Sequence, residues 1–72
     1  MFSEYDVVRL RSASSAPGVP IGAEGTVLII YPSTPPAYEV EFVDDADQSL
    51  GTFTMPESDL EIVWKAPPAE ES

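Results

Sequence analysis

The sequence contains no cysteine and no histidine. Disulfide bonds, thiolate nucleophiles and zinc sites built from the usual ligands are therefore excluded. Serine and threonine are plentiful, but the single lysine, Lys65, follows the last apolar segment, so no general base is at hand to activate a hydroxyl. We expect no catalytic residue, no cofactor and no metal ligand, and hence a protein that is not an enzyme.

Basic residues are also scarce. Three of them (Arg9, Arg11 and Lys65) oppose thirteen acidic residues, and the formal net charge is −10 at pH 7. Because phosphate binding depends on clustered Lys and Arg, direct binding to nucleic acid or to an anionic membrane is not expected. The excess acid either keeps the protein soluble or steers it toward a basic partner surface.

Long apolar runs are absent as well. The longest is Val27 to Tyr31, whereas a membrane helix needs roughly 20 apolar residues. The opening MFSEYDVVRL has acids at Glu4 and Asp6 and no basic stretch before an apolar one, which is unlike a signal peptide. We therefore expect a soluble cytoplasmic protein.

Short alternating segments predict β-strands. In 37–43, Tyr38, Val40 and Phe42 share one face while Glu39 and Glu41 share the other. The further strands expected from apolar and β-branched content are 5–10, 25–31, 50–55 and 60–64. No segment has a helical period over the roughly ten residues that a stable helix needs.

Turn-forming segments separate these strands. They are the long loop 12–22, the Pro-rich segment 32–36, the acidic turn 44–48, and 56–59, which favours one 3₁₀ turn. The pattern predicts an all-β fold, a small closed or partly open five-stranded barrel formed by residues 1–64. An open meander of three to five strands is the alternative. Residues 65–72 are rich in Pro and Glu and should form a disordered tail.

The predicted core consists of the inward-facing apolar residues of the strands. Its members are Val8, Leu10, Val27, Ile29, Tyr38, Val40, Phe42, Phe53, Leu60 and Ile62.

Four segments stand out in this order along the chain: EYDVVRL (4–10), IGAEGTV (21–27), YEVEFVD (38–44) and DLE (59–61). Together, and in this order, they resemble a family of short bacterial proteins catalogued as a domain of unknown function. The resemblance implies a small SH3-like barrel with a 3₁₀ turn before the last strand, similar to the nitrile hydratase β-subunit barrel and to KOW-type modules. It also implies a bacterial protein that partners the product of a neighbouring gene. It implies no active site.

An acidic stripe is the first candidate binding feature. Glu39 and Glu41 alternate with core residues, and Asp59 and Glu61 would extend the stripe if the last strand lies near the third, as would Asp6 and Glu57. The alternative is a solvated sheet face. The turn with Asp44, Asp45 and Asp47 lacks the ligand spacing of an EF-hand loop, so we expect no calcium site there.

Three aromatic residues at strand ends are the second feature. Tyr5, Tyr31 and Trp64 either cap the core, with their polar atoms in water, or form a contact patch.

We therefore expect a non-catalytic protein-interaction module that binds a basic protein surface through its acidic strand face. An antitoxin-like or immunity-like inhibitor of a neighbouring gene product would fit. The alternative is an accessory or subunit-like domain that assists the assembly or metal loading of an enzyme. A monomer is the default.

Overall fold

The computed structural model of the chain describes residues 1–12 and 16–67. The strands are β1 (Val7–Leu10), β2 (Glu24–Tyr31), β3 (Ala37–Val43), β4 (Ser49–Pro56) and β5 (Leu60–Trp64), and the 3₁₀ turn η2 (Glu57–Asp59) comes directly before β5. The expected all-β fold, with five strands and a 3₁₀ turn before the last, is confirmed. The described part of the chain contains no helix that could span a membrane.

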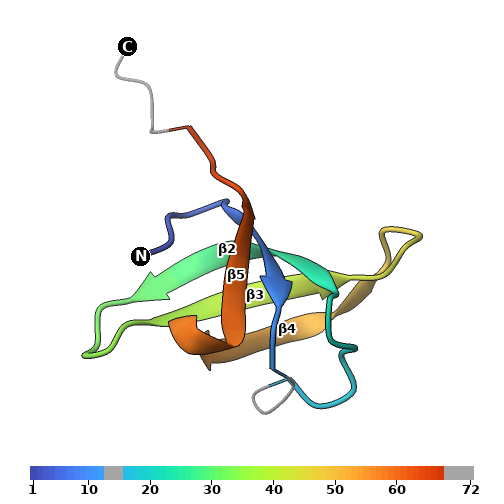
Figure 1. Cartoon of the computed structure of the whole chain (residues 1–72), viewed down its shortest axis with the longest axis horizontal. Coiled ribbons are helices and arrows are strands. Elements are labelled where there is room, and N and C mark those ends of the chain that lie inside the picture. The colour runs from blue at the N-terminus through green and yellow to red at the C-terminus, as the bar shows by residue number, and fades with distance from the viewer. Residues whose placement is uncertain (13–15, 68–72) are drawn as a thin grey trace.

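The strands form one antiparallel sheet in the order β4-β3-β2-β1-β5. The sheet curls, so that β1 and β5 run across β2, β3 and β4 (Figure 1). This curl lets Leu10 of β1 and Leu60 of β5 join Val40 and Met55 in one buried cluster. Strands β4 and β5 are the two edges of the sheet.

Seven of the ten predicted core residues are buried, Phe53 is partly buried, and the other two are exposed. Ile29 is 41% exposed and Ile62 is 44% exposed. The pairing of β2 with β3 shifts between Val27 and Ile29, so the alternation of β2 inverts and Ile30 packs against the core instead. Ile62 pairs with buried Val8, but it lies on an edge strand with no further strand beyond it.

Gly25 allows the sheet to pack tightly at its centre. It is buried in β2 and pairs with Phe42 on one side and Val8 on the other. A Cβ atom at Gly25 would lie 2.7 Å from Val40 Cγ1 and 2.8 Å from the Glu41 carbonyl oxygen. A side chain at this position would therefore force the β2–β3 pair apart.

The segment between β1 and β2 contributes to the core, which the sequence did not indicate. Ala16 and Val19 are buried, and the Val19 amide donates to the Ala16 carbonyl. Gly22, with a φ of +92°, donates its amide to the Leu10 carbonyl, and Leu10 donates to the Ala23 carbonyl. The end of this loop is thereby held against β1.

Candidate functional site

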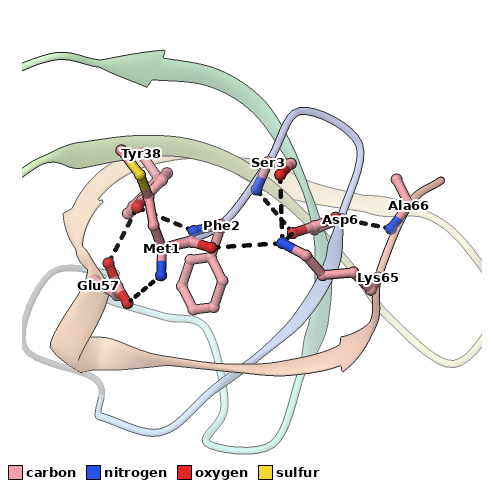
Figure 2. A network of polar contacts seen from close by, with 8 residues as sticks. All are labelled: Met1, Phe2, Ser3, Asp6, Tyr38, Glu57, Lys65 and Ala66. Carbon is pink, nitrogen blue, oxygen red and sulfur yellow. Dashed lines mark hydrogen bonds and ion pairs between the residues drawn. The ribbon is translucent and has the colours of Figure 1, made fainter. Parts of the chain in front are cut away.

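A buried carboxylate joins the two ends of the folded chain (Figure 2). The Asp6 side chain is fully buried, and its Oδ2 accepts from the Ser3 amide at 2.8 Å and from Lys65 Nζ at 2.9 Å. Its Oδ1 accepts from the Ala66 amide at 2.8 Å. Lys65 Nζ also approaches the Met1 carbonyl and Ser3 Oγ. Two residues of the segment 65–72 are thus bonded to Asp6, and residues 68–72 lie outside the described ranges.

The electrostatics of Asp6 suit a structural role. Burial raises the pKa of Asp6, but the hydrogen bonds from Ser3, Lys65 and Ala66 and the Lys65 charge outweigh burial, so the pKa lies below its ordinary value. A carboxylate held in its charged form, with both oxygens bonded, is not poised to exchange protons near neutral pH. Asp6 therefore links Ser3 to Lys65 and Ala66, and it does not belong to an exposed acidic surface.

A second group of contacts lies beside it. Tyr38 Oη accepts from the Phe2 amide and donates to Glu57, whose other oxygen is 3.2 Å from the Met1 amine. The Phe2 and Tyr38 rings pack with their centroids 5.1 Å apart. Burial raises the pKa of Tyr38, and the hydrogen bond from the amine lowers the pKa of Glu57. Glu57 is therefore engaged with the N-terminal segment and with the tyrosine.

The outer face of the sheet, opposite the core, brings several predicted site residues together. Paired residues on adjacent strands point to the same side. Counted from β5 to β4, one row on this face consists of Trp64, Val7, Thr26, Glu41 and Thr52. A second row consists of Ile29, Glu39 and Thr54. We call the surface formed by Ile29, Tyr31, Glu39 and Glu41 the β3 face.

Within the residues that the structure describes, the side chains of the two glutamates of the β3 face accept hydrogen bonds from hydroxyl groups alone. Tyr31 Oη donates to Glu39 at 2.7 Å, and Ser49 Oγ donates to Glu41 at 3.1 Å. The bond to Glu39 is the main cause that raises the pKa of Tyr31. No cation pairs with Glu39 or Glu41 in the described ranges 1–12 and 16–67. Their negative charge is therefore not balanced by an ion pair within the described residues.

Glu61 has a different environment on the same side of the sheet. Arg9 lies between it and Glu24, with nitrogen–oxygen distances of 3.6 Å to Glu61 and 3.9 Å to Glu24. Arg9 therefore offsets part of the charge at the β1–β5 end of the outer face. The acidic surface is concentrated on β3.

The other predicted site residues are dispersed. Asp59 is only 7% exposed, so it does not contribute to the acidic surface. Tyr5 is 60% exposed, but it lies in the turn before β1, with a φ of +69°, and not on a strand. Trp64 is 54% exposed on the outer face, and β1 and β2 separate its strand from β3.

Ile29 is the member of the β3 face that sequence reasoning missed. Its exposure follows from the irregular pairing after Val27, and the run VLIIY carries no polar residue or glycine that would mark the shift. Acidic residues occur on several elements, yet no group of three is arranged to hold a metal ion in the residues that the structure describes.

Comparison with known proteins gives a family and nothing beyond it. No curated protein and no solved structure matches the chain. The similarity to SH3-like barrels therefore stays a prediction. The family described as Domain of unknown function (DUF4926) matches residues 4–62, which include all strands except the end of β5. The chain belongs to this family.

Proposed function

We propose that the protein is a non-catalytic interaction module of the bacterial cytoplasm that binds a basic protein surface through the β3 face. One observation carries the proposal. Glu39 and Glu41 have no cationic partner in the described part of the chain, and they lie beside Ile29 and Tyr31, which are 41% and 37% exposed.

Carboxylates beside exposed apolar side chains are better explained by a protein-binding surface than by a face that only contacts water. The exposed apolar groups offer area to bury, and the adjacent carboxylates select a partner with Lys or Arg at matching positions. The net charge of −10 adds long-range attraction to such a partner. If the partner is a toxin or an enzyme, the β3 face would cover the active site of that partner when the two proteins bind.

A pull-down from extract of the source cells tests this proposal. The full chain is compared with the double variant Glu39→Gln and Glu41→Gln at low and at high salt. The matched control is Glu70→Gln and Glu71→Gln, which removes the same two charges beyond β5. We expect one basic protein to be retained by the native chain and by the control at low salt, and to be lost with the β3-face variant.

The captured protein is then purified and its association rate is measured against salt concentration. We expect the rate to fall steeply with salt, because exposed charges are screened within about 10 Å at 0.1 M salt. Equal retention by the β3-face variant and the control would contradict the proposal. Assaying the partner with and without the chain distinguishes an inhibitor from an assembly factor, since only the second leaves the partner inactive when the chain is missing.

A further inference from the structure

A groove lies at the opposite end of β3 from Ile29 and Tyr31. It has a volume of about 570 Å³ and lies between the end of the β1–β2 loop and the β3–β4 turn. One wall is formed by residues 20–24, and the other by Val43, Asp44, Asp45, Asp47 and Leu50. This volume falls within the range of about 300–1,000 Å³ that is typical of ligand sites.

The lining of the groove combines apolar and acidic groups. Ile21 is 59% exposed, although it is a large apolar residue, and it shares the groove with Val43 and Leu50. Asp45 and Asp47 are exposed on the facing wall. An isoleucine that is exposed in a concave surface offers apolar area that a ligand could remove from water.

Both walls are held in place by backbone contacts. On the loop side, the Gly22 amide donates to the Leu10 carbonyl and the Ala23 amide donates to the Pro20 carbonyl. On the turn side, Asp44 Oδ1 accepts from the amides of Ala46 and Gln48. A groove with fixed walls loses little conformational freedom when it is filled.

The charge of the groove is only partly balanced within the described residues. Arg9 lies 3.9 Å from Glu24, which lines the groove, and also pairs with Glu61, whereas Lys65 pairs with Asp6. The side chains of Asp45 and Asp47 have no cationic partner in that part of the chain, and no three acids there are arranged as metal ligands. The complement of this surface is therefore an organic cation attached to an apolar group, and not a metal ion.

We propose that this groove binds an extended basic peptide segment, with one aliphatic side chain against Ile21 and Leu50 and flanking Lys or Arg residues against Asp45 and Asp47. The surface differs from the β3 face, so this inference does not depend on the function proposed above. The groove would be a second surface, besides the β3 face, by which the protein recognises a basic partner.

Titration of the isotope-labelled full chain with two synthetic peptides, followed by NMR, tests the inference. The probe is acetyl-Lys-Arg-Leu-Arg-Lys-amide, and the comparison peptide has Ser in place of Leu, so that the charge is unchanged. We expect saturable shifts of the amides of Ile21, Gly22, Asp45 and Leu50, with those of Glu39 and Thr54 unmoved. The Ser peptide should bind roughly tenfold more weakly, since each buried methylene contributes about 0.8 kcal/mol.

Two variants locate the site. Ile21→Ser removes the apolar contact and should weaken the Leu peptide roughly tenfold but leave the Ser peptide unchanged. The double variant Asp45→Asn and Asp47→Asn should weaken both peptides by about two- to tenfold, and Asn tolerates the φ of +60° at Asp47. The control Glu70→Gln and Glu71→Gln should bind both peptides as the native chain does.

Three results would overturn the inference. They are equal affinity for the two peptides, shifts centred on the β3 face, and the absence of saturable shifts at millimolar peptide. None of them bears on capture of a protein partner through Glu39 and Glu41, so the two proposals can fail separately.

Discussion

The same three-residue pattern occurs twice in the chain and folds in opposite ways. Tyr5-Asp6-Val7 leads from a turn into the first residue of β1, and Tyr38-Glu39-Val40 lies within β3. At the first, the tyrosine is 60% exposed and the acid is fully buried. At the second, the tyrosine is fully buried and the glutamate lies on the outer face with the exposed Ile29. Local pattern alone therefore does not decide which side of the sheet a carboxylate occupies.

The difference follows from what surrounds each pattern. Tyr5 has a positive φ, which interrupts strand alternation, and the Ser3 amide, Lys65 and the Ala66 amide all bond to Asp6. At β3, both neighbouring strands continue the ladder, so alternation holds and Glu39 points away from Tyr38. A buried carboxylate requires such partners, whereas an exposed one does not.

The largest expected effect separates the two tyrosines. Tyr38→Ala removes a fully buried ring that contacts Phe2, and it should lower the free energy of unfolding by about 3–5 kcal/mol. Tyr5→Ala should change it by about 0.5 kcal/mol or less, because the side chain is largely in water. Urea unfolding of both variants measures the contrast. Similar losses from the two would show that Tyr5 packs in solution.

The next effect separates the two acids. Asp6→Ala leaves the amides of Ser3 and Ala66 without their acceptor and should cost roughly 2–3 kcal/mol of unfolding free energy. Glu39→Ala should cost less than about 0.5 kcal/mol, because it removes one hydrogen bond on an exposed face. Thermal unfolding of the pair provides the measurement, and a larger loss from Glu39→Ala would contradict the structure.

Acid should weaken the contribution that Asp6 makes to stability. Because the pKa of Asp6 in the folded protein lies below its ordinary value of 3.8, the unfolded chain binds the proton more readily in acid. The contribution of Asp6 to stability is therefore present at neutral pH and declines as the pH falls below about 4. Glu57 acts in the same direction. The unfolding free energy measured against pH should fall less steeply in Asp6→Asn than in the native chain.

The smallest expected effect is spectroscopic. The bond to Glu39 raises the pKa of Tyr31, so Glu39→Gln should bring that pKa back toward its ordinary value of 10.0. Ultraviolet titration of the phenol groups measures the shift, with Tyr31→Phe identifying the relevant tyrosine. Stability should change by no more than about 0.5 kcal/mol. An unchanged tyrosine titration in Glu39→Gln would show that the bond does not form in solution.

The sequence by itself determined how many strands form and where they lie along the chain. Alternation in 37–43 placed Tyr38, Val40 and Phe42 inside and Glu39 and Glu41 outside, and the structure agrees because β3 is paired on both sides. Pro and acidic residues marked the turns and the 3₁₀ segment, since these residue types restrict or satisfy the backbone locally. Such features depend on residues that are close together in the sequence, so the sequence pattern can predict them.

Only the tertiary structure decided the rest. Two partners of Asp6, Lys65 and Ala66, are 59 and 60 residues away, and no local sequence pattern predicts hydrogen bonds between such distant residues. The shift in β2 pairing exposes Ile29 because the β3 register, and not the VLIIY run, fixes which residues face the core. The groove exists because the curl of the sheet and the anchored loop bring Ile21 opposite Asp45. Contacts between distant segments therefore decide which of the many acidic side chains are buried and which face solvent.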